Sequence, residues 1–304
     1  ITILAIDPVW VHMPMNQATE FGSPFDYWLN ASDAFGIALW WVNDTTFFSI
    51  DSSGLLCNVS LLPVGIYWLE VRAYNQYGLY CSANMSVTCS DTTSPTWLVS
   101  PSIQNLEFGS SMSYDLDAFD LSSLDRWWIN DTSNFAIDNN GMISDLGNPA
   151  IGRYGILVSV NDTYGNTLTG DFSLTVEDTT PPTWVETPTD QTILYNDPLD
   201  YQLSATDLSG IGEWSIDDTL YFSISANGRI TSIGVLDVGE YGIMVSVSDP
   251  YGNSLGATFT VSVQPPDTTP PPPDNLMVLV VSTSIGAVVV IVIVIVYLRR
   301  PGGG

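Results

Sequence analysis

The chain has 304 residues, with 33 Asp and Glu against six Arg and no Lys, which gives a formal net charge of −27. This charge repels nucleic acid and anionic lipid headgroups, so we expect no nucleic-acid partner, whereas it attracts cations and favours solubility in salt. Apolar residues at 45% and aromatic residues at 12% exclude a disordered chain.

An internal repeat organises the chain, because Phe48, Phe135 and Phe222 stand in equivalent contexts 87 residues apart. The shared residues of the clearest copy are Phe222, Ile224, Gly228, Gly239, Tyr241, Tyr251 and Gly252. The same residue types recur one and two steps earlier without a gap, which indicates tandem modules. The sequence therefore predicts three modules, at residues 8–92, 93–179 and 180–264, each long enough for a small core.

Each module opens with Pro-x-Trp, as at Pro182–Trp184, and continues through an extended segment that ends in Ala-x-Asp, as at Ala205–Asp207. A short strand around Trp214 follows, then a hairpin over residues 222–233, and then two longer strands in which apolar and polar residues alternate. Period-two alternation over seven short runs, bounded by Gly, Asp, Asn and Pro, predicts an antiparallel β-sandwich in each module.

The segments that connect the modules are short and contain proline. Asp91–Trp97 and Asp178–Trp184 are expected to be stiff, because proline fixes φ and removes a backbone donor. Residues 265–275 include four consecutive prolines, which favours an extended polyproline II stalk after the third module.

The C-terminal segment is strongly apolar. Residues 276–298 carry no charge over 23 positions, enough for one helix to cross the ~30 Å hydrocarbon core of a bilayer. Arg299 and Arg300 follow directly, and the positive-inside rule places them in the cytoplasm. We therefore expect a single-pass cell-membrane protein with a transmembrane helix at 276–298, a cytoplasmic tail at 299–304 and its N-terminal modules outside the cell.

Two motifs resemble a known family. Phe-x-Ile-x-x-x-Gly-x-Ile and Gly-x-Tyr-x-x-x-Val-x-Val-x-Asp-x-x-Gly, with the alternating strand that follows, resemble the cadherin-like repeats of the dystroglycan type and related Ig modules. The linker Asp178-Thr-Thr-Pro-Pro-Thr resembles those that join such repeats in archaeal and bacterial surface proteins. The resemblance covers residues 8–264 and implies an all-β chain of three tandem Ig/cadherin-like sandwiches, a role in cell adhesion, and calcium binding. Tyr67, Tyr154 and Tyr241 also stand where Ig-like domains place a tyrosine corner.

Carboxylates are expected to gather at the junctions between modules. In an Ig-like sandwich the loops after the second and sixth strands lie at one end, and in the resembled family that end receives the incoming linker. The residues concerned are Asp91, Asp120 and Asp162 at the first junction, and Glu177, Asp178, Asp207 and Asp249 at the second. Hard oxygen ligands in this number suit Ca²⁺. The alternative is that each Asp only caps its own turn.

The sequence offers little for catalysis. His12 is the only histidine, and no Cys-x-x-Cys, His-Glu-x-x-His or Gly-rich phosphate loop occurs, so we expect no enzyme activity. Cys81 and Cys89 stand eight residues apart on one predicted strand, which is roughly 27 Å and too far for a disulfide. A bridge from Cys57 to either of them stays open.

Six Asn-x-Ser/Thr sequons predict a glycoprotein, at Asn30, Asn43, Asn58, Asn84, Asn130 and Asn161.

Adjacent tryptophans face opposite sides of a strand. We expect Trp40, Trp127 and Trp214 in the cores. Trp41 and Trp128 are then half-exposed, and they either stack on a sugar or other ligand or pack across strands.

Together these features predict a membrane-anchored cell-surface protein that acts in adhesion or surface-layer structure. Its expected partners are other surface proteins, copies of itself, or glycans. A glycan- or ligand-binding receptor ectodomain, with Trp41 and Trp128 as its platform, is the alternative, and a passive spacer is a third option.

Overall fold

The computed structural model describes residues 5–266, 276–285 and 288–297. All regular elements in these residues are β-strands. The chain divides into two compact units, Ile1–Thr180 with the first two modules and Pro181–Gly304 with the third. The division falls one residue after the end predicted for the second module.

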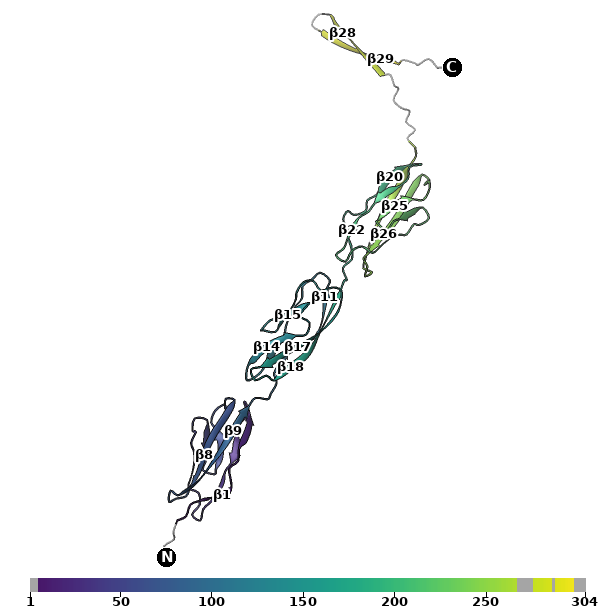
Figure 1. Cartoon of the computed structure of the whole chain (residues 1–304). Coiled ribbons are helices and arrows are strands. Elements are labelled where there is room, and N and C mark those ends of the chain that lie inside the picture. The colour runs from purple at the N-terminus through teal and green to yellow at the C-terminus, as the bar shows by residue number, and fades with distance from the viewer. Residues whose placement is uncertain (1–4, 267–275, 286–287, 298–304) are drawn as a thin grey trace. The chain divides into compact units, whose positions relative to one another are not determined.

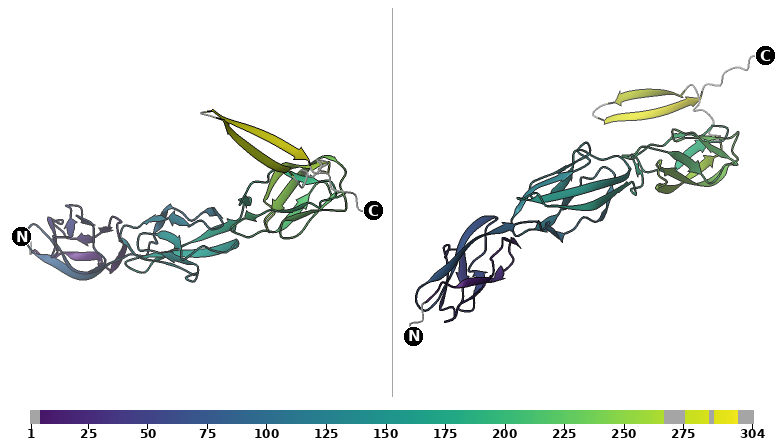
Figure 2. Two further views of the ribbon diagram at one scale, coloured as in Figure 1. Left: turned by 90° about the horizontal axis from the view of Figure 1, so that it is seen from above. Right: turned by 60° about the horizontal axis from the view of Figure 1, so that its bottom comes forward.

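The first module contains two sheets and a short strand pair (Figure 1, Figure 2). Its four-stranded sheet has the order β2 (Gln17–Glu20), β9 (Tyr80–Ser90), β8 (Gly65–Tyr74), β5 (Leu39–Val42). Its three-stranded sheet has the order β3 (Asp26–Trp28), β7 (Leu55–Asn58), β6 (Phe48–Ile50). The short pair joins β1 (Val9–His12) to β4 (Asn30–Ser32).

The second module repeats this arrangement strand for strand. Its four-stranded sheet is β11 (Ile103–Glu107), β18 (Thr167–Glu177), β17 (Gly152–Asp162), β14 (Leu124–Ile129). Its three-stranded sheet is β12 (Ser113–Asp115), β16 (Met142–Asp145), β15 (Phe135–Ile137). The short pair is β10 (Thr96–Val99) with β13 (Asp117–Phe119).

The third module, in the second unit, has the same topology. Its four-stranded sheet is β20 (Gln191–Leu194), β27 (Ser254–Gln264), β26 (Gly239–Ser248), β23 (Glu213–Ile216). Its three-stranded sheet is β21 (Asp200–Gln202), β25 (Arg229–Ser232), β24 (Phe222–Ile224). The short pair is β19 (Thr183–Trp184) with β22 (Ala205–Thr206).

One strand pair in each module departs from the predicted antiparallel arrangement. β2 runs parallel to β9, β11 to β18, and β20 to β27. The first extended segment of each module divides at Pro14, Pro101 or Pro188, and its two halves join different sheets. Proline lacks the N–H that would continue a ladder, so the chain changes sheet there and its second half runs beside the last strand. The four-stranded sheets are therefore mixed, whereas the three-stranded sheets are antiparallel as predicted.

Both sheets of a module contribute to one apolar core. In the first module, Phe48 and Leu56 of the three-stranded sheet pack in one cluster with Leu69 and Val87 of the four-stranded sheet. Each of these four side chains is at most 1% exposed. Corresponding clusters form in the second and third modules. Each predicted module therefore has a core of its own.

The predicted core tryptophans are buried: Trp40, Trp127 and Trp214 are 9%, 6% and 8% exposed. Each packs against the tryptophan of its module's opening Pro-x-Trp, with ring centroids 5.7 to 6.0 Å apart.

The glycine of the Phe-x-Ile-x-x-x-Gly motif lies against this core tryptophan. Gly228 has a φ of 81°, and a Cβ there would lie 2.8 Å from the carbonyl oxygen of Leu203 and 2.9 Å from the Trp214 ring. Gly54 and Gly141 have equivalent surroundings. A side chain at this position is therefore excluded by both backbone conformation and packing.

The tyrosine corner is present in all three modules, as predicted. In each, the tyrosine hydroxyl donates a hydrogen bond to the backbone oxygen four residues earlier. The pairs are Tyr67 with Pro63 at 2.7 Å, Tyr154 with Ala150 at 2.9 Å, and Tyr241 with Asp237 at 3.1 Å.

The C-terminal segment differs from the prediction of a helix at 276–298. β28 (Leu276–Ile285) and β29 (Val288–Tyr297) pair as antiparallel strands. In the described part of the chain no helix has the length and apolar character needed to cross a bilayer. β29 consists of Val and Ile apart from its final Tyr, and β-branched residues favour strands over helices outside a membrane. Most of the predicted stalk (267–275) and the predicted tail (299–304) lie outside the described residues.

Candidate metal centre

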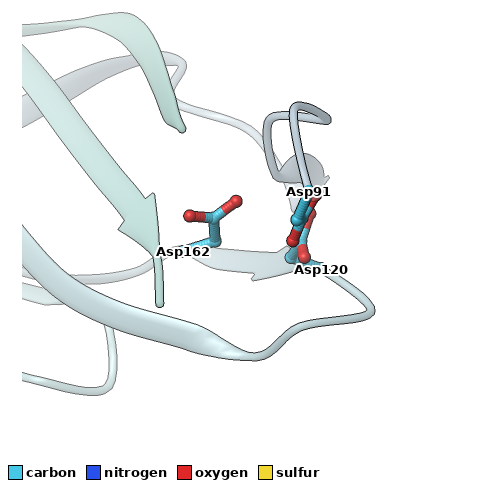
Figure 3. Close-up of side chains that lie close together, drawn as sticks. All are labelled: Asp91, Asp120 and Asp162. Carbon is cyan, nitrogen blue, oxygen red and sulfur yellow. The ribbon is translucent and has the colours of Figure 1, made fainter. Parts of the chain in front are cut away.

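Three carboxylates from separate segments lie together at the start of the second module (Figure 3). Asp91 comes from the linker, Asp120 follows β13, and Asp162 ends β17. Each contributes one carboxylate oxygen, and these atoms all lie within 4.8 Å of one another. The structure thus brings together the three residues that the sequence analysis grouped at the first junction.

Asp162 is the buried member of the group, with 1% of its surface exposed. Its Oδ1 accepts hydrogen bonds from the backbone N–H groups of Tyr164 and Asn166 at 2.8 and 2.9 Å. Its Oδ2 accepts one from Nδ2 of Asn166 at 2.7 Å. These bonds offset the cost of burying a carboxylate. The same Nδ2 donates to the backbone oxygen of Asp91 at 3.1 Å, which ties the linker to the second module.

Asp120 and Asp91 each cap a turn through one oxygen. Oδ1 of Asp120 accepts hydrogen bonds from the backbone N–H and the hydroxyl of Ser122, at 2.8 and 2.7 Å. Oδ1 of Asp91 accepts one from the N–H of Thr93 at 3.2 Å. Oδ2 of Asp91 is buried and has no hydrogen-bond partner in the described part of the chain. Turn capping and clustering are therefore not exclusive, because capping uses only one oxygen of Asp91 and one of Asp120.

The donor set fits a hard divalent cation. All three groups are carboxylates, and Ca²⁺ takes oxygen ligands at about 2.3–2.6 Å. Ligand atoms around one such ion are at most about 5 Å apart, and the three oxygens of this group, all within 4.8 Å of one another, meet that limit. A cation here would also satisfy the buried Oδ2 of Asp91, whose lack of a donor is otherwise costly.

The second unit holds two of the corresponding carboxylates. Asp207 and Asp249 stand one repeat step after Asp120 and Asp162, and an oxygen of each lies within 4.8 Å of the other. The backbone N–H and hydroxyl of Ser209 donate to Oδ1 of Asp207 at 2.8 and 2.7 Å.

Asp249 is 3% exposed and is held like Asp162. Its burial raises its pKa, but hydrogen bonds from the side chain of Asn253 and from the backbone of Tyr251 and Asn253 outweigh this effect. The net result is a pKa below the usual value, so Asp249 is ionised at neutral pH.

The remaining predicted ligands lie at the end of the first unit. Oδ1 of Asp178 accepts a hydrogen bond from the N–H of Thr180 at 3.2 Å, as Asp91 does one repeat step earlier. Glu177 ends β18 and is exposed. Its counterpart is Ser90, so the first junction has no carboxylate at this position.

A carboxylate that the sequence analysis missed holds the linker to the preceding module. Glu20, at the end of β2, accepts hydrogen bonds from the N–H of Thr92 at 2.7 Å and from its hydroxyl at 2.8 Å. The hydroxyl of Thr93 donates a third at 2.9 Å. These bonds, led by that of the Thr92 N–H, lower the pKa of Glu20.

Glu107 makes the same contacts one repeat step later. The hydroxyls of Thr179 and Thr180 each donate to it at 2.7 Å, and together with the Thr179 N–H they lower its pKa to about 2. The third module has Leu194 at this position. One feature of the sequence could have indicated this contact. Two successive repeats have both the glutamate and the Thr-Thr pair, whereas the third module lacks the glutamate.

Trp41 and Trp128, the predicted ligand platform, each lie beside an arginine. Cζ of Arg72 is 4.5 Å from the ring centroid of Trp41, and Cζ of Arg126 is 5.3 Å from that of Trp128. Arg72 also lies 4.9 Å from the ring of Tyr80. Cation–π contacts of this kind favour the packing alternative for both tryptophans.

The three cysteines are free thiols. Cys89 is one of the buried residues of the first core, and Cys81 is partly buried and packs against other residues of that core. Burial raises the pKa of both thiols. Sγ of Cys57 lies 3.4 Å from the hydroxyl of Ser49.

The sequons differ in how far their side chains are engaged. Nδ2 of Asn58 donates to the backbone oxygen of Ser60 at 2.8 Å, and that of Asn161 to Asp125 at 3.3 Å. Asn43 and Asn130 accept a backbone hydrogen bond from the neighbouring strand at 2.9 Å each. Among the described residues nothing hydrogen-bonds the exposed side chains of Asn30 and Asn84.

No protein-family model matches the chain, and no curated protein matches it significantly. Solved structures of tandem domains do resemble it. The first three extracellular cadherin domains of Drosophila N-cadherin are 14% identical, with 83% of this chain and 98% of that chain covered and a TM-score of 0.39. A three-domain immunoglobulin fragment of titin is 13% identical, with 86% and 99% covered and a TM-score of 0.35. A mouse cadherin-23 fragment is 16% identical, with 85% and 99% covered and a TM-score of 0.35.

Proposed function

We propose that the protein is a membrane-anchored cell-surface protein that acts in adhesion or surface-layer structure, and that its module junctions bind Ca²⁺. The observation that carries this proposal is the group of Asp91, Asp120 and Asp162 between two tandem modules. The partners we propose are other surface proteins, copies of this chain, or glycans on a neighbouring surface.

The residues of the first junction would let a bound ion stiffen it. Asp91 belongs to the linker, whereas Asp120 and Asp162 belong to the second module, so shared coordination would join the two. Glu20 already holds the same linker to the first module through Thr92. A bound Ca²⁺ would supply the positive charge that offsets repulsion among three carboxylates within 4.8 Å.

The repeat extends the proposal to the second junction. Asp178, Asp207 and Asp249 stand one step of 87 residues after the first group, and their turn contacts repeat those of the first group. Glu177 would add a fourth carboxylate there.

Membrane anchoring is supported by residues 276–298, which are uncharged over 23 positions and are followed by Arg299 and Arg300. A two-stranded hairpin leaves backbone groups unpaired along its outer edges, which hydrocarbon does not tolerate, whereas a helix pairs them internally. We therefore propose that this segment is helical within the bilayer, with the modules outside the cell.

Calcium binding is tested by thermal unfolding of residues 1–274 with Ca²⁺ or with excess chelator at constant ionic strength. We expect Ca²⁺ to raise the unfolding temperature and to narrow the distribution of lengths measured by X-ray scattering. D120N combined with D162N should remove the response of the first junction only, and D207N combined with D249N that of the second. D171N removes an exposed charge outside both groups and should leave both responses unchanged. If calcium changes neither quantity in the wild type, the junctions do not bind it.

Anchoring is tested by ending the chain after Asp274. The shortened protein should be soluble and folded, whereas the full chain should stay with membranes after a carbonate wash. A shortened protein that still sediments with washed membranes would show that another segment is the anchor.

The adhesive role is tested by comparing the aggregation of cells that display the full chain with that of cells that lack it. Aggregation that depends on both the protein and calcium is expected. Equal aggregation of both cell types would leave a spacer as the better description, and binding of the ectodomain to defined glycans on an array would favour the receptor.

A further inference from the structure

One tryptophan of the first module stands where the fold needs no side chain. Trp68, on the outer face of β8, is 72% exposed. The second and third modules have Gly155 and Gly242 at this position. A Cβ built on either glycine meets nothing within 4 Å, so the two sheets close without this side chain. The core of the module does not need this indole, and its exposed face is open to a surface contact.

An asparagine on the next strand lies beside this tryptophan. In the register of β8 and β9, Trp68 is opposite Ser86, and Asn84 is opposite Glu70. Residues two apart on a strand face the same side, so Asn84 and Trp68 are diagonal neighbours on the outer face of the sheet. Diagonal neighbours are about 7–8 Å apart, which is within reach of an aromatic side chain.

Asn84 heads the sequon Asn84-Met85-Ser86, and the repeat links this sequon to the tryptophan. The second and third modules have Asp171 and Thr258 in place of Asn84. The first module has both the exposed indole and the sequon, and the other two modules have neither. A contact between the indole and a group on Asn84 requires that the two residues occur together in this way.

The folded module accommodates a sugar on Asn84. The side chain is exposed and takes part in no hydrogen bond among the described residues, so a sugar there breaks none, whereas Nδ2 of Asn58 and of Asn161 is already bonded. Ser86, the hydroxyl residue of the sequon, is only 6% exposed within the finished sheet. Sugar transfer at Asn84 therefore has to precede the pairing of β9.

We propose that Asn84 carries an N-linked glycan whose first sugar rests on the indole of Trp68. In the transfer, Nδ2 of Asn84 bonds to the anomeric carbon of an activated donor sugar. The bond from that carbon to the donor's phosphate leaving group breaks, and Nδ2 gives up one proton. A pyranose ring has one face of carbon-bound hydrogens, and this face covers the apolar face of the indole. The glycan thus shields the most exposed tryptophan of the described chain.

The test uses the full chain, produced in cells that glycosylate Asn-x-Ser/Thr sequons. N84D and W68G place at each position a residue that another module already carries there. Mass spectrometry of glycopeptides measures occupancy at Asn84, and hydroxyl-radical footprinting measures the oxidation of Trp68. We expect a sugar on Asn84 in the wild type and in W68G. Because the sugar covers one of two ring faces, oxidation of Trp68 should rise about twofold in N84D. Trp28, which is 63% exposed on the other sheet, is the internal control and should not change.

Three results would overturn the proposal. One is an unmodified Asn84, whether or not the other sequons carry sugar. Another is a modified Asn84 with equal oxidation of Trp68 in the wild type and N84D. The third is strong protection of Trp68 in both proteins, which would assign the indole to another occupant such as a second copy of the chain.

Discussion

Nδ2 of Asn75 donates a hydrogen bond to Oδ2 of Asp33 at 3.3 Å. These residues stand one repeat step before Asp162 and Asp120, so the first module has an amide where the others have a second carboxylate. The same nitrogen donates to the backbone oxygen of Ile6 at 3.0 Å, and Asn75 is 3% exposed. The first module thus satisfies its loop carboxylate without a cation, and it serves as an internal control for the other two.

This relationship predicts the effect of N75D. The substitution removes the donor and places a second buried carboxylate next to Asp33, so the first module should become less stable in chelator. Added Ca²⁺ should recover part of this loss and raise the unfolding temperature more in N75D than in the wild type. N75A also loses the hydrogen bond but adds no charge, so calcium should not recover its stability. Equal calcium responses of N75D and N75A would contradict the role of the second carboxylate.

The contact of Glu107 with the linker predicts that the wild type and E107Q lose stability to different extents in acid. The pKa of Glu107 is lowered from 4.5 to about 2, so the unfolded chain binds more protons in this interval. Stability from this contact is complete above about pH 4.5 and is lost as the pH falls toward about 2. E107Q does not titrate, so its unfolding temperature should be lower at neutral pH and should fall less between these two values. E213Q, at an exposed glutamate, should follow the wild type throughout. If the curves of E107Q and the wild type are parallel, the contact does not contribute.

The sequence predicted the parts of the site that follow from the repeat. The step of 87 residues aligned Asp120 with Asp207 and Asp162 with Asp249, and loop topology placed them at one end of a sandwich. It did not reveal Glu20, because its contact with Thr92 joins positions 72 residues apart in the chain. Turn and sequon motifs describe only neighbours in sequence, whereas this contact depends on how β2 lies beside β9.

The conformation of the C-terminal segment could not be predicted from the sequence for a different reason. A run of Val and Ile has high strand propensity and is also long enough to cross a bilayer, so its conformation depends on the solvent around it. Composition alone does not choose between these states, whereas alternation of apolar and polar residues did identify the long strands of each module.

The tyrosine corner predicts a small and specific loss of stability. The hydroxyl of Tyr241 donates to the backbone oxygen of Asp237 at 3.1 Å, and the ring packs against Phe222. Y241F keeps the ring but removes the donor, so it should lower the free energy of unfolding of the third module by about 1 kcal/mol. Y251F is the control, because Tyr251 is 54% exposed and its hydroxyl has no hydrogen bond among the described residues. Equal stability of Y241F and Y251F would mean that the corner bond adds nothing beyond solvation of the hydroxyl.

The contact between Gly228 and the core tryptophan predicts that one added methyl group at Gly228 lowers the stability of the third module strongly. Gly228 has a φ of 81°, and an added Cβ would meet the backbone oxygen of Leu203 at 2.8 Å and the Trp214 ring at 2.9 Å. Neither neighbour can move freely, because one is backbone and the other is 8% exposed in the core. Backbone strain and overpacking together should cost G228A roughly 2–4 kcal/mol in the free energy of unfolding of the third module. Chemical denaturation, followed by tryptophan fluorescence, measures this loss.

A second glycine of the same module separates this packing effect from the general effect of replacing glycine. Gly242 lies within β26, and a Cβ there would meet nothing within 4 Å. G242A should therefore leave stability unchanged or raise it slightly, by about 0.4–1 kcal/mol, since alanine restricts the unfolded chain. If G228A and G242A have similar effects, neither the contact with Trp214 nor the positive φ of Gly228 excludes a side chain at this position. G228N separates these two contributions, because asparagine adopts positive φ more readily than alanine but still carries a Cβ. Loss of stability in both G228A and G228N, with G242A unaffected, assigns the requirement to contact with the tryptophan.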